Sequence, residues 1–396
     1  MKKIKITDSL SFPEDNKATT SLFVIGAVGL IASAIGYFVN REQFYFSYLT
    51  SFAFIASLTL ASLMYVMLQH LTHSSYSVVF RRVPEVIAKN IIYIAILFIP
   101  IFFGMHYLFE WTHWTPQEIA ASKVLPYKAP FLNYKFYIIR YFIYFGIWSF
   151  FGYRMYKISI KMDETGDWGL QTLLRRTSGP GLFLFAITVA FASFDWLMEL
   201  DPHWYSTIFG IYFFAMSFQA FFAMLILILL YMRKKGILAN TITDKHFSDL
   251  GLLLFGFTVF YAYIAFAQFL LIYYANIPEE VVWFNAHLRG SYIYIGWAIV
   301  IGRFAIPFVV LIGQEAKKSL TVLKYVSILV IFMQFIELYW LVMPNFHKTG
   351  IHVSWIDFAT IIGLGCLFLG LFFNTFKKHC MIPKNDPLLA DSLNKH

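Results

Sequence analysis

Charged residues and cysteines, on which many soluble proteins depend, are scarce in this chain of 396 residues. Charged residues make up 13% of the sequence and there are 2 cysteines, whereas 59% of the residues are hydrophobic. About a quarter of the residues in a typical soluble domain are charged, so the chain lacks the polar surface that a water-soluble fold needs. Cys366 and Cys380 provide neither a disulfide framework nor a set of iron–sulfur ligands. The composition predicts an integral membrane protein.

Motifs of soluble catalysis are also missing from the sequence. It contains no phosphate-binding P-loop, no HExxH, no G-x-S-x-G and no dinucleotide-binding fingerprint. The 11 histidines fall in loops or at the ends of predicted spans, so none predicts haem b held between histidines at mid-membrane. The net charge of +9 is explained by basic loops beside anionic lipids, without a nucleic-acid partner. Residues 1–20 show no signal-peptide pattern.

Long apolar runs dominate the rest of the sequence. They are continuous and rich in Phe, Ile and Leu rather than alternating, which favours helices over a membrane β-barrel. A window of about 20 residues predicts an all-α membrane protein of ten transmembrane helices, with polar tails at 1–20 and 377–396. The predicted spans are 21–39, 46–68, 86–108, 134–156, 180–199, 206–232, 248–275, 285–312, 320–343 and 354–376.

The distribution of lysine and arginine predicts the orientation. If the N-terminus is cytoplasmic, most of the 31 basic residues lie in inner segments, as the positive-inside rule requires. Arg140 and Arg303 then fall within spans. The outer segments hold only Arg41, Lys123, Lys128, Lys135, Arg289 and Lys348. Both termini are therefore expected in the cytoplasm.

An internal echo suggests a repeat. The predicted fifth span ends with Asp195 seven residues before Pro202, and the ninth ends with Glu337 seven residues before Pro344. Tryptophan lies between the acid and the proline in both segments. Two related four-helix bundles, at about 46–199 and 206–343, with flanking helices, would produce this match.

Ionisable residues inside predicted spans are the main candidates for function, because charges are costly in a bilayer. Asp195 and Glu199 are four residues apart, so on a continuous helix they would share a face. Such a pair would raise one carboxyl pKa and suit proton exchange. Alternatively, Arg140 pairs with a carboxylate and keeps it ionised. The further outward candidates are His203, His287 and Glu337.

Structural roles remain open for several of these groups. Asp201-Pro202 and Ser206 are typical of a turn and a helix cap, and His203 at the water interface suits a hydrogen bond as well as a site. Asp357, three residues after Ser354, is typical of a first helical turn.

Polar residues near mid-depth form the last group of candidates. Arg303 lies four residues before Pro307, which frees a backbone carbonyl that a nearby Arg or water can satisfy. Arg303 is thus either a neutralised interior arginine or part of a pathway. Three glutamines either support a chain of water or only join helices; they are Gln219, Gln268 and Gln334.

Three stretches resemble a known family. FASFDWLMELDPHWYSTIFGIYFF (191–214), IGRFAIPFVVLI (301–312) and ELYWLVMPNF (337–346) resemble the smaller NrfD-like membrane subunit of bacterial alternative complex III, a quinol:electron-acceptor oxidoreductase. The wider superfamily includes the polysulfide-reductase membrane subunit. The resemblance implies two four-helix bundles with outer helices, in the bacterial cytoplasmic membrane.

The resemblance also implies partners and cofactors. The expected partners are multihaem cytochrome and iron–sulfur subunits, a larger related membrane subunit and a terminal oxidase; these partners would hold haem c and iron–sulfur clusters. Menaquinol or ubiquinol would bind near a carboxylate and a histidine at outer helix ends, residue types that Asp195 and His203 match. The hairpin here reads Asp-Pro-His-Trp, where the larger sister is expected to read Pro-Gly-Trp-His, so a proton path or a structural role is implied beside a quinone site.

Other classes of function fit some of the same features. A secondary transporter would also combine repeats with intramembrane carboxylates. A third possibility is a purely structural scaffold subunit of the complex. No self-contained active site is expected in the chain.

Overall fold

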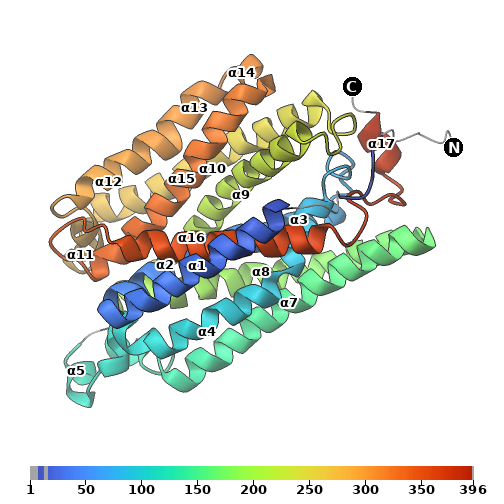
Figure 1. Ribbon diagram of the computed structural model, residues 1–396. Coiled ribbons are helices and arrows are strands. Elements are labelled where there is room, and N and C mark those ends of the chain that lie inside the picture. The colour runs from blue at the N-terminus through green and yellow to red at the C-terminus, as the bar shows by residue number, and fades with distance from the viewer. Residues whose placement is uncertain (1–7, 13–16, 123, 395–396) are drawn as a thin grey trace.

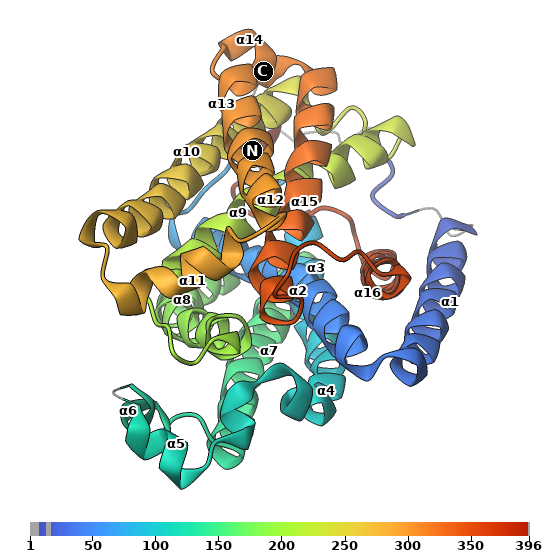
Figure 2. The same cartoon turned by 90° about the vertical axis from the view of Figure 1, so that its left-hand side faces the viewer.

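The computed structural model describes residues 8–12, 17–122 and 124–394, and every regular element in these ranges is a helix. Figures 1 and 2 show long helices packed side by side, with short helices in the connections. The helices longer than one or two turns are α1 (Lys17–Val39), α2 (Arg41–Leu71), α3 (Arg82–Lys89), α4 (Ile91–Leu108), α7 (Tyr134–Thr165), α8 (Gly169–Trp196), α9 (Phe209–Lys234), α10 (Asp244–Ala275), α11 (Pro278–His287), α12 (Tyr292–Ile299), α15 (Leu320–Val342) and α16 (Trp355–Phe376).

Short elements complete the chain. The segment η3 is π-helical and joins α12 to α13 within one long helix, whereas α17 lies in the C-terminal tail. The short elements are η1 (Glu110–His113), α5 (Pro116–Ala121), α6 (Leu125–Lys128), η2 (Met198–Leu200), η3 (Val300–Ala305), α13 (Ile306–Leu311), α14 (Gln314–Lys318), η4 (Met343–Asn345) and α17 (Leu389–Leu393).

In the described part of the chain, 9 helices are long and apolar enough to cross a membrane. The prediction of an all-helical, multi-pass membrane protein is therefore confirmed. The predicted span 134–156 forms the long helix α7, which packs beside α4 and α8 (Figure 1) but is not among those 9. We call the end of the bundle with residues 109–133 the outer end, following the predicted orientation. The described N-terminal and C-terminal segments both lie at the opposite, inner end, where the Met381 amide donates to the Leu10 carbonyl.

Local sequence signals define several helix ends. The Asn40 and Asn133 side chains accept the backbone N–H three residues on, which caps α2 and α7. Gly166 ends α7 with φ +68°, a left-handed conformation that glycine adopts without strain. Ser354 and Asp357 form a capping box at the start of α16, as the first-turn interpretation of Asp357 predicted. The Asp357 carboxylate also accepts from Gln43 on α2 at 3.1 Å, so it ties the two helices together.

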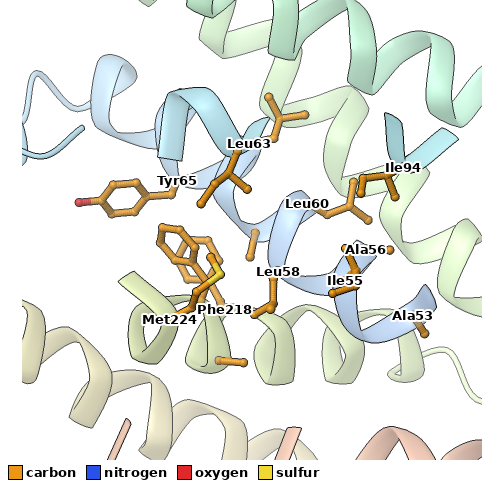
Figure 3. Close-up of a cluster of buried hydrophobic side chains, with 14 of the residues drawn as sticks. Ala53, Ile55, Ala56, Leu58, Leu60, Leu63, Tyr65, Ile94, Phe218 and Met224 are labelled. Atoms are coloured by element: carbon orange, nitrogen blue, oxygen red, sulfur yellow. The ribbon is translucent and has the colours of Figure 1, made fainter. Parts of the chain in front are cut away.

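The centre of the molecule is formed by α2, α9 and α15. The first two are largely buried along their lengths, whereas α1, α10 and α12 are mostly exposed. Figure 3 shows the apolar contact between α2 and α9, in which Leu58 lies near Phe218 and Met224. The Tyr65 ring contacts Phe221 and Phe222 of α9. A peripheral pair is formed by α1 and α16. Their backbones approach closely, since a Cβ added to Gly29 would lie 2.6 Å from Gly363 Cα, as is typical of glycine contacts between membrane helices.

Candidate functional site

The first buried ion pair, site one, joins Asp195 near the outer end of α8 to Arg140 on α7. The Arg140 Nε donates to Asp195 Oδ2 at 2.8 Å, and Nη2 donates to Oδ1 at 2.7 Å. Two parallel bonds of this kind are the strongest arginine–carboxylate geometry. Both side chains are buried. Of the two alternatives, the structure therefore shows the one in which Arg140 pairs with a carboxylate.

The remaining polar atoms of site one also have fixed partners. Arg140 Nη1 donates to the Phe131 carbonyl at 2.7 Å, and the Tyr144 hydroxyl donates to Asp195 Oδ2 at 2.9 Å. The guanidinium carbon lies 3.7 Å from the centre of the Phe131 ring. Site one is thus a closed clamp between α7, α8 and the segment before α7.

Glu199 does not share a helix face with Asp195, which corrects the prediction from their spacing. The helix α8 ends at Trp196, and Glu199 lies in the short helix η2. Its carboxylate oxygens are 3.1 and 3.0 Å from Lys128 Nζ, which also donates to the Trp204 carbonyl at 2.7 Å. Each of the two acids therefore has its own cation partner.

The His203 side chain makes no contact with Asp195 among the interactions of the described residues. This side chain is 53% exposed, and Nε2 lies 3.4 Å from Glu110 Oε1 on the short helix η1, which follows α4 at the outer end. In the same turn, burial raises the pKa of Asp201 above its ordinary value. The Asp201 carboxylate accepts the His203 backbone N–H at 3.2 Å, which is the turn chemistry that the sequence predicted. The carboxylate–histidine pair implied by the family resemblance is therefore separated here.

The second buried ion pair, site two, lies deeper and joins Arg303 on η3 to Glu337 on α15. Arg303 Nη1 is 2.5 Å from Glu337 Oε2, and both side chains are completely buried. These two atoms make no aligned hydrogen bond, although they are in contact. The other oxygen, Oε1, accepts the hydroxyls of Tyr212 on α9 and of Tyr261 on α10, the latter at 2.7 Å.

Two of the three candidate glutamines complete site two. Arg303 Nε donates to Gln219 Oε1 at 2.9 Å, and Nη2 donates to Gln334 Oε1 at 2.5 Å. The Gln334 amide then donates to Ser57 on α2 at 3.1 Å. Site two therefore links helices α2, α9, α10 and α15 to the π-helical segment near the middle of the bundle.

Pro307 explains part of this arrangement. Proline has no N–H to donate to the carbonyl four residues earlier, which is that of Arg303. The sequence predicted that a nearby Arg or water would satisfy the freed carbonyl. In the structure, the Gln219 amide donates to it at 3.2 Å. Gln219 thus accepts from the Arg303 side chain and donates to its backbone.

The other two candidates lie outside both sites. His287 ends α11, before the span that begins at Tyr292, and its ring lies 3.8 Å from that of Trp283. Burial lowers the pKa of His287 to about 4, so the ring is neutral near pH 7. Gln268 is buried on α10, and its Oε1 has no hydrogen-bond partner among residues 8–12, 17–122 and 124–394.

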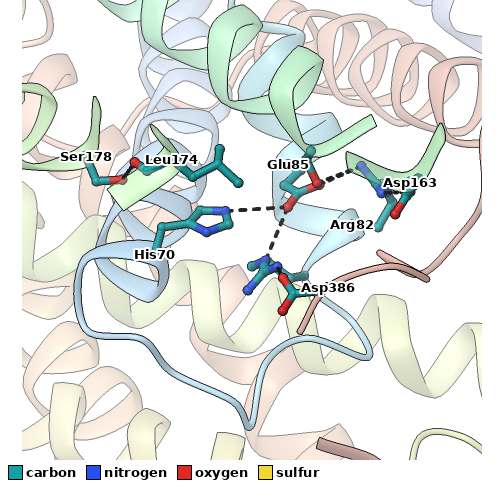
Figure 4. A network of polar contacts seen from close by, with 9 residues as sticks. His70, Arg82, Glu85, Asp163, Leu174, Ser178 and Asp386 are labelled. Carbon is teal, nitrogen blue, oxygen red and sulfur yellow. Dashed lines mark hydrogen bonds and ion pairs between the residues drawn. The ribbon is translucent and has the colours of Figure 1, made fainter. Parts of the chain in front are cut away.

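The sequence interpretation missed a third cluster, at the inner end, which Figure 4 shows. Glu85 on α3 accepts from Arg82 at 2.8 Å and from Arg81 at 3.3 Å. The two arginines also bind Asp163 on α7 and Asp386 in the C-terminal tail. The spacing of Arg81 and Arg82 before Glu85 suits ion pairs along one helix, a signal that was present in the sequence. In the sequence analysis, these arginines count only among the basic residues of the inner segments.

No group of three or more His, Cys, Asp or Glu side chains that could hold a metal ion occurs in the described part of the chain. Comparison with protein-family models gave no match, and neither did a search of curated proteins.

Proposed function

We propose that this chain is a membrane subunit of a respiratory quinol:electron-acceptor oxidoreductase complex, and that site two forms part of a proton path through it. The observation that carries the proposal is the completely buried Glu337–Arg303 pair near the middle of the bundle. Removing each ion from water costs several kcal/mol. Ionisable residues retained at such depth are functional by default.

The surroundings of Glu337 suit proton transfer. One carboxylate oxygen faces Arg303, and the other accepts two tyrosine hydroxyls that can exchange protons with it. The glutamines that hold Arg303 extend the polar chain to Ser57 on α2. Site one offers less support for the same role, because its guanidinium and carboxylate are held by fixed neighbours at one end of α8.

The setting of this proposal rests on the sequence resemblance. The chain is proposed to cross the bacterial cytoplasmic membrane ten times as two four-helix bundles with flanking helices, with both termini in the cytoplasm. Multihaem cytochrome and iron–sulfur partners would supply the redox groups. A larger related membrane subunit would lie beside it, and a terminal oxidase would accept the electrons. Menaquinol or ubiquinol would be oxidised near the outer end, at the sister or next to Asp195.

One observation favours a second candidate, a secondary transporter. The π-helical segment Val300–Ala305 interrupts the helix α12–α13 beside Pro307 and carries the buried Arg303. Transporters build solute and ion sites at interrupted helices near mid-membrane, and π-helical segments occur often at functional sites.

Affinity purification through a tag on this chain, from its native membrane, tests the proposal. We expect co-purification of haem- and iron–sulfur-bearing subunits and quinol-dependent reduction of cytochrome c. In proteoliposomes, the double variant Tyr212→Phe/Tyr261→Phe retains the ion pair but removes both hydroxyls. Proton release per electron is expected to fall to the one proton per electron that quinol oxidation releases by itself, since both hydroxyls that would exchange protons with Glu337 are removed.

Tyr144→Phe at site one is the matched control and should leave the proton-to-electron ratio unchanged. An unchanged ratio in the double variant would contradict the proton path. Isolation of the chain alone, without redox partners and with solute uptake in liposomes, would favour the transporter.

A further inference from the structure

An apolar groove lies between the helix pair α1–α16 and the central helices α2, α9 and α15. Its volume is about 570 Å³, within the range of about 300–1,000 Å³ that is typical of ligand sites. Near the inner end, the groove begins at Ala18 on α1, Tyr231 on α9 and Phe373 on α16. Ile25 at its edge is 48% exposed, so the groove is open toward the lipid.

Glycines in α16 create this space in two ways. Gly363 touches Gly29 of α1 and brings the two backbones into contact. Gly365 instead lines the groove, and a Cβ added there would meet no atom within 4 Å. The missing side chain at Gly365 therefore leaves open volume rather than a tight helix contact.

The lining excludes a polar ligand group from the interior. Apart from Ser21 and Tyr231, the described residues that line the groove are apolar or glycine, and none of them is charged. From Gly365 to Phe373 the groove follows α16 for about 12 Å at 1.5 Å per residue. This length is close to half of a bilayer core about 30 Å thick. The groove thus has the length and polarity that an acyl chain of the inner leaflet requires.

Positive charge surrounds the inner mouth of the groove. Lys235 lies one turn after Tyr231 on the chain, and Lys377 lies one turn after Phe373. Their neighbours Lys234 and Lys378 are also exposed, and the described residues provide no ion pair for any of the four lysines. Arg233 differs, because it pairs with Asp244.

Lys17 also begins α1 at this end. The described lysines at the mouth are therefore Lys17 together with those at the inner ends of α9 and α16.

We propose that the groove binds one acyl chain of an anionic phospholipid of the inner leaflet, with its phosphate held by Lys235 and Lys377. The apolar interior selects the chain, and the lysines at the mouth select the negative headgroup. A lipid bound there fills the space between the peripheral pair and the core and fixes α1 and α16 against α9. The site is separate from the proposed proton path and does not depend on it.

Photo-crosslinking of the full-length protein in nanodiscs tests this site. The probes are phosphatidylglycerol and phosphatidylcholine, each carrying a diazirine near the middle of one acyl chain. We expect phosphatidylglycerol crosslinks to concentrate on peptides that contain 18–25, 224–231 and 365–373, with a yield at least about fivefold above that of phosphatidylcholine, as expected for one lysine near the headgroup.

Two pairs of variants separate the acyl site from the charge site. Gly365→Leu fills the groove and should abolish crosslinking at the three peptides with both probes. Its control is Gly256→Leu on α10, where an added Cβ also meets no atom. Lys235→Gln/Lys377→Gln should remove the preference for phosphatidylglycerol and retain crosslinking. Its control is Lys157→Gln/Lys161→Gln, which removes exposed charge from the inner part of α7, away from the groove.

Uniform labelling around the protein that Gly365→Leu does not change would overturn the proposal. So would equal yields for the two lipids in the unchanged protein. A quinone tail or a partner helix found in the groove of the assembled complex, with no phospholipid, would show a different occupant and reject the lipid.

Discussion

The buried arginine–carboxylate pairs at site one and site two use the same charges in different surroundings. At site one, Arg140 donates two parallel hydrogen bonds to Asp195, and its third nitrogen donates to the Phe131 carbonyl. At site two, Arg303 gives aligned hydrogen bonds to Gln219, Gln334 and the Met216 carbonyl, while its contact with Glu337 is short but unaligned. No hydrogen bond or ion pair between described residues joins the two sites.

Site one is therefore a clamp, in which one ion pair joins two helices, whereas site two is a network of hydrogen bonds that joins several helices. A bidentate pair fixes two helices through one geometry. At site two, two glutamines and a backbone carbonyl accept the hydrogen bonds of Arg303. Two tyrosines on other helices donate to the Glu337 carboxylate. Because buried ion pairs give little net stability, the wider network at site two has to be explained by something other than stability, and the proposed proton path provides that explanation.

The largest expected difference between the sites comes from removing one arginine. Arg303→Met leaves Glu337 without its cation and removes the donors of three further acceptors. Breaking a buried pair costs about 3–5 kcal/mol, and we expect Arg303→Met to be more destabilising than Arg140→Met. Thermal or denaturant unfolding of the purified chain in nanodiscs measures both. Arg154→Met, on the inner part of α7, is the control and should change the free energy of unfolding by less than about 0.5 kcal/mol. A loss for Arg303→Met no larger than that for Arg140→Met would refute the expectation.

Removing both charges together should distinguish the sites further. Arg140→Leu/Asp195→Leu leaves only Tyr144 and one carbonyl without partners, so it should recover most of the about 3–5 kcal/mol that each single variant loses. Arg303→Leu/Glu337→Leu should recover less. Each tyrosine or glutamine group left unpaired there costs about 1–3 kcal/mol. A double-mutant cycle on the unfolding free energies gives both values, and equal recovery would mean that the two sites are equivalent.

Single tyrosine variants compare the two sites when the expected loss of unfolding free energy is similar. Tyr261→Phe and Tyr144→Phe each remove one hydrogen bond to a charged carboxylate, worth about 1.5–3 kcal/mol. We expect similar losses of unfolding free energy, but only Tyr261→Phe should lower proton release per electron in proteoliposomes. If Tyr144→Phe lowers this ratio equally, the division into clamp and network is wrong.

The smallest effect is expected at the turn that follows site one. Because burial raises the pKa of Asp201, the folded state binds its proton more tightly than the unfolded state. Its contribution to stability is therefore favourable at low pH and is lost as the pH rises from about 4. The corresponding turn after α15 carries Asn345 and no acid.

Asp201→Asn removes the acid from the turn after site one, so that this turn, like the one after α15, carries asparagine and no carboxylate. It should remove this part of the pH dependence and change the unfolding free energy near pH 7 by less than about 1 kcal/mol. Melting curves from about pH 4 to about pH 7 compare the variant with the unchanged chain. An identical pH dependence in both would show that Asp201 does not titrate in this range.

Hydropathy predicted most of the helices because continuous apolar runs have one dominant physical explanation. The predicted spans 320–343 and 354–376 match α15 and α16 almost to the residue. The start of α8 was missed by about three turns, because Arg175 and Arg176 made its first turns resemble a loop. The span 86–108 is in fact two helices, α3 and α4, separated at Asn90.

The charged residues of the sites were found more readily than their partners. Depth in a span identified Asp195, Glu337 and Arg303 from hydropathy alone. Pairings such as Lys128 with Glu199 join segments far apart in the sequence, and a single sequence contains no signal for such contacts. The shared helix face expected for Asp195 and Glu199 failed for a local reason, since the helix ends between them.

The ion pair between Arg81 and Asp386 has a consequence for biosynthesis. Ribosomes make the chain from its N-terminus, so Arg81 enters the membrane long before Asp386 is synthesised. Until the tail folds back, Arg81 has only Glu85 as a carboxylate partner among those that bind it in the finished protein. The segment around Asp386 therefore completes the partners of Arg81 only after most of the chain has been made, so this inner end of the bundle is among the last parts to reach its final packing.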